Sequence, residues 1–312
     1  MISAKPLPFP KYVPPKLWKK PKQRPLGRAK SVTLAAGFSC NDGVVICADT
    51  EMSIPGFVKY PESKIRVYSK LKTKPVFTFA GDTNFCGMYM HRIAKTIRDN
   101  ESKKLGQLEQ AILDEARAIH TEYSTDDYEQ CSTLIMSLWW PSIKRRYLYE
   151  LSRGVANCIK GVSCCGTGVA VTTGMMRELF SAHLSTQEVT LLAIYFLAEA
   201  KAYGDGVGKD SEVIVLHNSG SIEYFPEHPC SLEIKEIEED YLILKRHLKP
   251  ILAALSNVSI TPEAFADKLR DFSMLISAHK NKRQATYESL EKWWYRLDDD
   301  DGYEIEEDDI TL

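Results

Sequence analysis

The order of patterned segments in the sequence predicts an α+β protein built as a four-layer αββα sandwich. Strand-like runs, two helical stretches, more strand-like runs, two further helical stretches and a closing hairpin follow one another up to residue 225. Two sheets packed face to face, each covered on its outer face by a helix pair, accommodate this order. At 312 residues the chain is long enough for one such core and an appended segment.

The segment 31–50 predicts a β-hairpin. Two apolar runs flank an Asn-Asp-Gly turn at 41–43, and these residue types tolerate the positive φ angles of tight hairpin turns. Ser31 stands at the start of the first run, and Asp49 ends the second. Because a hairpin lays its strands side by side, we expect the Asp49 carboxylate to lie near the start of the first strand.

Further strand-like runs at 64–69 and 76–80 complete the first group, and two amphipathic helices follow. Apolar residues recur three and four positions apart over 84–99 and 105–123, which places them on one face of each helix. After the helices, three apolar runs predict a strand meander. These runs cover residues 131–140, 145–151 and 155–159.

A second helix pair is predicted over 169–180 and 185–203. Ser185 and Glu188 have the spacing of a capping box, in which each side chain bonds the backbone at the start of the helix. Two apolar runs around an Asn-Ser-Gly turn then predict the hairpin that closes the sandwich. The strands of this hairpin cover 212–217 and 221–225.

The start of the chain differs from the predicted sandwich domain, which we assign to residues 31–230. Residues 1–30 are rich in proline, lysine and arginine and contain no acidic residue. Proline at this density prevents regular helix and favours an extended chain. We therefore expect an extended basic arm or propeptide. It lacks the folded platform that a nucleic-acid site requires.

The end of the chain predicts a helical extension over 231–297 and an acidic tail over 298–312. Amphipathic patterns at 240–255 and 262–278 indicate two helices in the extension. Just before the tail stands Trp-Trp-Tyr at 293–295, which would pack on the domain or, alternatively, dock on a neighbouring subunit.

The overall composition is that of a globular protein, with 44% hydrophobic and 26% charged residues and a net charge of −2. No apolar run approaches the roughly 20 residues that a membrane helix needs. The basic start of the chain is broken by prolines and lacks the apolar segment of a secretory signal. We expect a cytoplasmic protein that binds neither nucleic acid nor membrane.

The cysteines and histidines give no indication of a metal site. None of the eight cysteines stands in a Cys-x-x-Cys pair, and most lie within apolar runs, as buried free thiols do. The histidines lie far apart in the sequence. We therefore expect neither a metal nor an organic cofactor.

Four motifs follow one another along the predicted sandwich. They are the hairpin from Ser-Val-Thr-Leu-Ala to Val-Ile-Cys-Ala-Asp-Thr at 31–50, Glu-Ser-Lys-Ile-Arg-Val at 62–67, Phe-Thr-Phe-Ala-Gly-Asp-Thr at 77–83 and Val-Ser-Cys-Cys-Gly-Thr-Gly at 162–168. In this order and spacing the chain resembles proteasome β-type subunits and the related bacterial HslV protease, which are N-terminal-nucleophile (Ntn) hydrolases. The resemblance covers residues 31–225. It implies the αββα Ntn-hydrolase fold, a homo- or hetero-oligomeric ring and a polypeptide substrate.

The resemblance also implies a set of site residues. In this family the chain is cut before a hydroxyl nucleophile, and the freed α-amine, with a pKa of about 8, serves as its base. Ser31 takes the position of the nucleophile. Asp49 would orient its surroundings, and the charge of Lys64 would lower the pKa of the hydroxyl and the amine. The remaining positions are Gly81, whose N–H would stabilise the oxyanion, and Thr167, a supporting hydroxyl.

Each of these positions also has an alternative interpretation. Thr33 is a second candidate nucleophile, because it lies two residues further along and on the same face of the strand. Taken singly, the other residues have ordinary structural explanations. Asp49 would be a turn cap, Lys64 a solvated edge charge, Gly81 a strand end and Thr167 a helix cap.

Three functions are consistent with the sequence. The candidate site residues favour a proteasome-like peptidase that works in a ring, and we prefer this function. Two departures from the family favour a catalytically inactive structural subunit instead: Lys30 replaces the glycine that precedes the cut, and Glu51 stands where the family often has arginine. The third function is an amidohydrolase that acts on a small amide.

Overall fold

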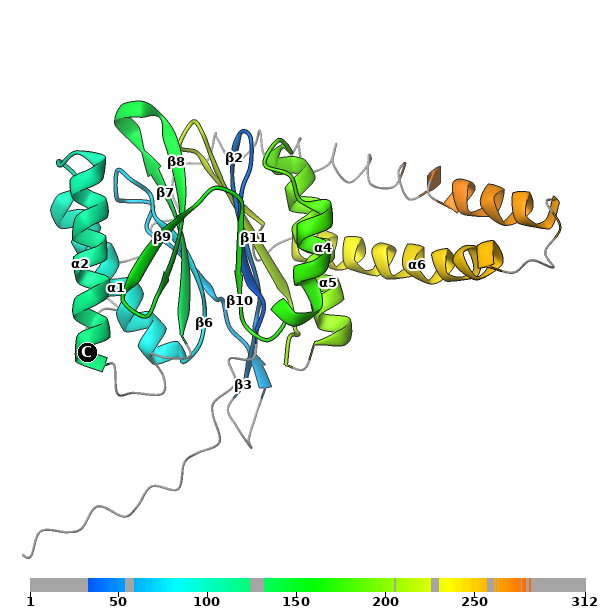
Figure 1. The fold of residues 1–312 in the computed structure, drawn as a ribbon, viewed down its shortest axis with the longest axis horizontal. Coiled ribbons are helices and arrows are strands. Elements are labelled where there is room, and N and C mark those ends of the chain that lie inside the picture. Colours follow the sequence, from blue (N-terminus) through cyan, green and yellow to red (C-terminus); the bar gives the residue numbers. More distant parts are fainter. Residues whose placement is uncertain are drawn as a thin grey trace, which may run out of the picture.

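The computed structural model of the chain describes residues 33–53, 59–123, 132–204, 206–225, 230–256, 261, 263–275, 277–278 and 281. Within them the strands form two five-stranded antiparallel sheets and one two-stranded ribbon. The two sheets stack face to face, and helices cover both outer faces (Figure 1). The predicted α+β class and its four-layer αββα arrangement are confirmed.

The first sheet has the strand order β10-β1-β2-β11-β12. The hairpin of β1 and β2 forms as predicted, and β2 also pairs with β11, which places Ser211 opposite Asp49. β10 lies on the other side of β1 and was not predicted as a strand. The strands are β1 (Ala35–Ser39), β2 (Gly43–Asp49), β10 (Val162–Cys165), β11 (Ser211–His217) and β12 (Ile222–Phe225).

The second sheet has the order β5-β6-β7-β8-β9, so each strand pairs with its neighbour in sequence. A 3-10 turn at Pro141–Ile143 joins β7 to β8. The separate ribbon pairs β3 (Glu51–Ser53) with β4 (Lys59–Pro61). The strands of the second sheet are β5 (Ile65–Val67), β6 (Val76–Ala80), β7 (Thr133–Trp140), β8 (Arg145–Ser152) and β9 (Val155–Ile159).

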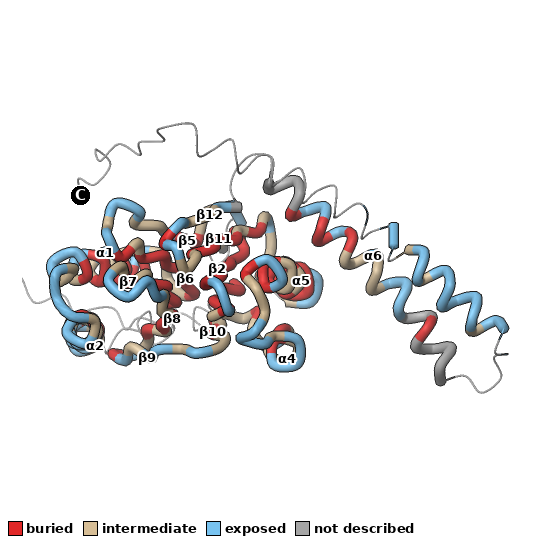
Figure 2. The backbone as a smooth tube through the Cα atoms, turned by 90° about the horizontal axis from the view of Figure 1, so that it is seen from above, coloured by how far each residue is buried: buried red, intermediate tan, exposed pale blue. Residues whose placement is uncertain are grey.

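Two helix pairs cover the sheets. α1 (Thr83–Asn100) and α2 (Leu105–Tyr123) pack on the second sheet, and α4 (Val169–Leu179) and α5 (Thr186–Tyr203) pack on the first (Figures 1 and 2). The predicted capping box at the start of α5 is present. None of the helices in the described part of the chain has the length and apolarity needed to cross a membrane.

A long helix, α6 (Cys230–Ser256), begins against α5 and continues beyond the sandwich (Figure 1). It starts at Cys230 rather than at the predicted residue 240. A further helix over 263–275 runs back beside it, and its residues are mostly exposed (Figure 2). The basic arm, the Trp-Trp-Tyr segment and the acidic tail lie outside the described residues.

Three apolar clusters separate the four layers. One lies between the two sheets and contains Ile46, Ile135 and Leu148, and the other two lie between each sheet and its helices. Gly37 of β1 faces the central cluster. Because a protein interior is close-packed, the sheets approach each other only as closely as the side chains of the central cluster allow.

Replacing Gly37 tests this close approach. A Cβ atom at Gly37 would lie 2.7 Å from Leu148 Cδ1 and 2.8 Å from Ile135 Cγ2. We expect Gly37→Ala to lower the free energy of unfolding in urea by roughly 1–3 kcal/mol, the usual effect of overpacking a core.

Gly174→Ala is the matched control, because Gly174 lies inside α4 with no atom near the position of its Cβ. Alanine favours the helix over glycine by up to about 1 kcal/mol, so this variant should be stabilised. Equal changes in the two variants would contradict the close packing at Gly37.

Candidate active site

Three buried side chains meet at one end of the sandwich. Thr33 precedes β1, Asp49 ends β2, and Lys64 immediately precedes β5 of the other sheet. The Lys64 ammonium donates to Thr33 Oγ1 at 2.5 Å and to Asp49 Oδ1 at 2.9 Å. The Thr33 hydroxyl in turn donates to Asp49 Oδ1 at 2.5 Å. A hydroxyl group is thus held between a cation and a carboxylate.

The register of the first hairpin determines which hydroxyl reaches Asp49. The Asp49 N–H donates to Leu34 O at 3.1 Å, so Asp49 stands across from Leu34. Thr33 is next to that position, whereas Ser31 lies two residues earlier in the chain and outside the described residues. Thr33, the second candidate from the sequence, therefore makes the contacts expected of the nucleophile. Counting back from the Asn-Asp-Gly turn in an antiparallel register would have indicated it.

The Asp49 carboxylate is fully buried and held by backbone N–H groups as well as by Lys64. Oδ1 accepts from Leu34 N at 2.9 Å, and Oδ2 accepts from Glu51 N and Gly208 N, each at 3.1 Å. These bonds satisfy both oxygens and fix the plane of the group. The carboxylate therefore has a defined orientation toward the Thr33 hydroxyl.

Lys64 is 1% exposed, so it is not a solvated edge charge. Burial lowers the pKa of the Lys64 ammonium below its ordinary value, while Asp49, Glu51 and Glu212 act in the opposite direction. Glu51 is itself buried and pairs with Lys59 of β4 at 2.6 Å. The acidic residue that departs from the family pattern is thus part of the carboxylate surroundings of Lys64.

Glu212 of β11 positions the chain at Lys64 and was missed by the sequence analysis. Its Oε2 accepts from Ser63 Oγ at 3.0 Å and from Lys64 N at 3.2 Å. Burial raises the pKa of the Glu212 carboxyl, although both hydrogen bonds oppose the shift. A glutamate within the apolar run of β11 is the sequence signal that could have drawn attention to it.

The turn after β10 packs directly on Thr33. Gly168 N donates to Thr33 O at 3.0 Å. Gly166 has a φ of +100°, and a Cβ there would collide with the Thr33 carbonyl. Thr167, between these glycines, is half-buried. The structure therefore brings the predicted Cys-Gly-Thr-Gly turn to the same end of the sandwich as Asp49 and Lys64.

Gly81 follows β6 with a φ of +142°, where glycine is strongly favoured. A Cβ atom on Gly81 would overlap Ser132, which is 3% exposed. Packing against Ser132 is therefore sufficient to explain why this position is glycine. The thiol of Cys165 donates to Thr133 O at 3.9 Å, so the end of β10 contacts this end of the second sheet.

No group of three or more histidine, cysteine, aspartate or glutamate side chains in the described ranges could hold a metal ion. Six cysteines are free thiols: Cys40, Cys47, Cys86, Cys158, Cys164 and Cys165. The site residues are thus a hydroxyl, an amine and carboxylates. This set suits proton transfer and nucleophilic attack by a hydroxyl.

Comparisons with known proteins agree with this fold. A family model described as proteasome subunit matches residues 30–216. Anbu, described as an ancestral beta-subunit, from Yersinia bercovieri has a similar structure, with 13% identity and a TM-score of 0.58 over 73% of this chain and 100% of that chain. Anbu from Hyphomicrobium sp. strain MC1 is similar at 11% identity and a TM-score of 0.56, over 73% of this chain and 100% of its own. The curated proteins include no match to this chain.

The buried ion pair predicts an asymmetric response to mutation. Asp49→Asn leaves the Lys64 ammonium buried without its carboxylate, and we expect a loss of about 3–5 kcal/mol in the free energy of unfolding. Lys64→Met should lose less, because Asp49 keeps three backbone N–H donors and the Thr33 hydroxyl. Urea unfolding of both variants measures the difference.

The control is Asp114→Asn, which breaks an ion pair with Arg117 whose side chains are both 60% exposed. This variant should change stability by no more than about 0.5 kcal/mol. A Lys64→Met loss as large as that of Asp49→Asn would show that the backbone donors do not hold the carboxylate as described.

Proposed function

Because the chain belongs to the proteasome subunit family, we propose that it is a proteasome-type Ntn peptidase with the Thr33 hydroxyl as its nucleophile. The observation that carries this proposal is the contact of Thr33 Oγ1 with both Lys64 Nζ and Asp49 Oδ1. Assembly into an oligomeric ring, a polypeptide substrate and a cytoplasmic location belong to the same proposal. Ser31 is the alternative nucleophile, on the strength of the sequence resemblance.

The proposed chemistry begins with a cut between Val32 and Thr33, which frees an α-amine on Thr33. An α-amine has a pKa of about 8 and accepts the hydroxyl proton at neutral pH. Thr33 Oγ1 then attacks the substrate carbonyl. The tetrahedral intermediate releases the amine half of the peptide, which takes up the proton, and leaves an ester on Thr33 that water hydrolyses.

Lys64 and Asp49 have separate roles in this chemistry. The Lys64 ammonium at 2.5 Å stabilises negative charge on Oγ1, which favours loss of its proton. Asp49 holds both the ammonium and the hydroxyl in place. The Gly81 N–H is the proposed oxyanion donor, and Thr167 the proposed supporting hydroxyl.

A second function is favoured by the burial of the proposed nucleophile. Thr33 is 3% exposed in the uncut chain. While the preceding residues stay attached, the Thr33 nitrogen is part of a peptide bond, so no α-amine is available as the base. If residues 1–32 stay attached, the chain is a catalytically inactive structural subunit that keeps the fold. The N-terminus of the purified protein distinguishes these functions.

The test is intact mass and N-terminal sequencing of the protein purified from its own host, followed by assays with a panel of peptide substrates and small amides. We expect a chain that begins at Thr33 and hydrolyses peptides. Thr33→Ala should reduce the rate by roughly 10³-fold or more, since a removed nucleophile leaves only binding and oxyanion stabilisation. Thr33→Ser should keep measurable activity.

Ser31→Ala is the matched control and should process and hydrolyse normally. A chain that begins at Ser31 and loses activity in Ser31→Ala would assign the nucleophile to Ser31. A chain that retains Met1 would overturn the peptidase and leave the structural subunit. Hydrolysis of small amides alone would indicate the amidohydrolase.

A further inference from the structure

A buried carboxylate of α6 contacts the strand that lies beside Asp49. Glu238 Oε1 accepts from Ser211 Oγ at 2.5 Å and from Lys201 Nζ of α5 at 2.8 Å. Ser211 begins β11 and is paired with Asp49 of β2. Glu238 is 9% exposed and Ser211 5%. A single buried network therefore joins α6, α5 and the start of β11.

The segment 208–211 is bonded to the site on one side and to α6 on the other. On the site side, Gly208 N donates to Asp49 Oδ2 at 3.1 Å. The Asp210 backbone N–H donates to Thr50 Oγ1, and its carbonyl accepts from Thr50 N, both at 2.9 Å. On the α6 side, Glu238 holds Ser211, and Lys235 pairs with Asp210 at 2.7 Å. The pair with Lys235 is partly exposed, so the buried Glu238 bond is the stronger restraint.

We propose that Glu238 is a positioning residue of the candidate site. By holding Ser211 it fixes the segment 208–211, and through Gly208 N–H this segment fixes the orientation of the Asp49 carboxylate. Asp49 in turn holds the Thr33 hydroxyl and Lys64. The catalytic consequence rests on the proposed peptidase function, whereas the restraint of 208–211 does not.

The restraint comes from a part of the chain that lies outside the residues matched by the proteasome subunit family model, which end at 216. α6 starts at Cys230. Its first half packs on α5 through Ile234 and Ile237, which are buried with the core of the first sheet and α5. The extension is thus packed into the domain that carries the site.

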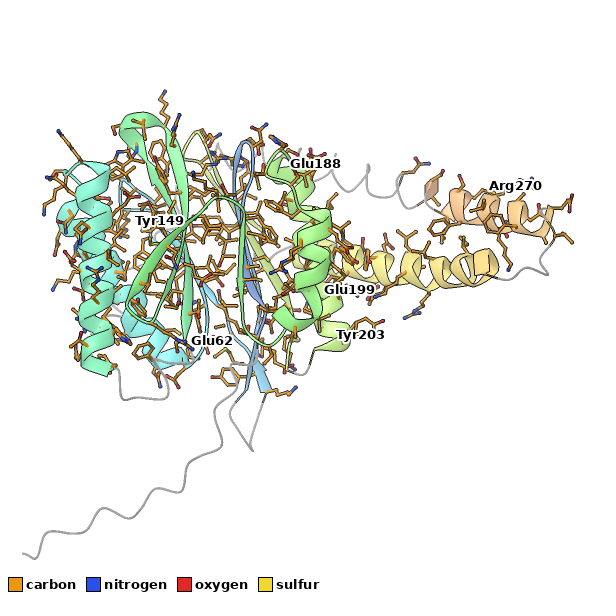
Figure 3. All side chains as sticks on the ribbon, in the orientation of Figure 1. Glu62, Tyr149, Glu188, Glu199, Tyr203 and Arg270 are labelled. Carbon is orange, nitrogen blue, oxygen red and sulfur yellow. The ribbon has the colours of Figure 1, made fainter. Side chains whose placement is uncertain are left out.

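A matched control exists further along the same helix. Lys245 of α6 donates to Glu199 of α5 at 2.6 Å, and Glu199 is 3% exposed. Figure 3 labels Glu199 where α5 meets α6. Lys245→Met breaks an α5–α6 ion pair whose carboxylate is buried, as Glu238→Ala removes a buried carboxylate, but the hydrogen bonds of Lys245 go to Glu199 and not to the segment 208–211. This variant distinguishes a general loosening of α6 from a specific loss of the restraint on the segment 208–211.

The experiment measures backbone amide exchange by mass spectrometry together with kcat and KM for a peptide substrate. In Glu238→Ala we expect at least tenfold faster exchange over 208–211, and kcat lowered by up to about 10²-fold with KM little changed, since small misplacements of catalytic groups have effects of this size. Glu238→Gln keeps an acceptor for Ser211, so its exchange rate over 208–211 and its kcat should both be close to those of the unaltered protein. Lys245→Met should speed exchange only in α6.

Unchanged exchange over 208–211 in Glu238→Ala overturns the proposal, and so does an equal increase in Lys245→Met. Faster exchange with unchanged kcat overturns the positioning role while leaving the restraint. If the unaltered protein hydrolyses no peptide, the proposed peptidase function fails, and the exchange measurements alone decide whether Glu238 holds the segment.

Discussion

The buried ion pair between Lys64 and Asp49 is the interaction on which the site depends. Transfer of a lysine ammonium out of water is strongly unfavourable unless a carboxylate accompanies it. Here the two charges come from different sheets, because Asp49 ends a strand of the first sheet and Lys64 precedes a strand of the second. The pair therefore forms only when the sheets are stacked. The low dielectric constant around it strengthens the electrostatic interaction between Lys64 and the Thr33 hydroxyl.

Close backbone approach is the second constraint. Thr33 is enclosed by the turn after β10, and this is sterically possible because Gly166 and Gly168 carry no side chains against Thr33 and Leu34. The hydroxyl consequently has one position, between Lys64 and Asp49, and little freedom to leave it. A nucleophile held in this way needs little reorganisation before attack, which is the main physical advantage of a preorganised site.

The sequence predicted the parts of this structure that depend on local patterns. The helices and most strands follow from periodicity, and the first hairpin from its Asn-Asp-Gly turn. Asp49 and Lys64 became candidate site residues through the motif order. The choice between Ser31 and Thr33 depends on strand register, which the motif order does not determine. β3, β4 and β10 are too short to show a period. Glu212 and Glu238 act through contacts that packing creates, the first with residues 148 and 149 positions away, and no local pattern reports such contacts.

The distribution of the site along the chain has a consequence for synthesis. Thr33 and Asp49 are made early, but the turn at 166–168, Gly208 and Glu212 are made much later, and Glu238 later still. A chain emerging from the ribosome thus carries its hydroxyl long before the groups that hold and surround it exist. The complete set of contacts around Thr33 therefore forms only after translation has passed these later segments, when the domain can fold as a unit. Assembly of the candidate site is thus coupled to completion of the domain fold.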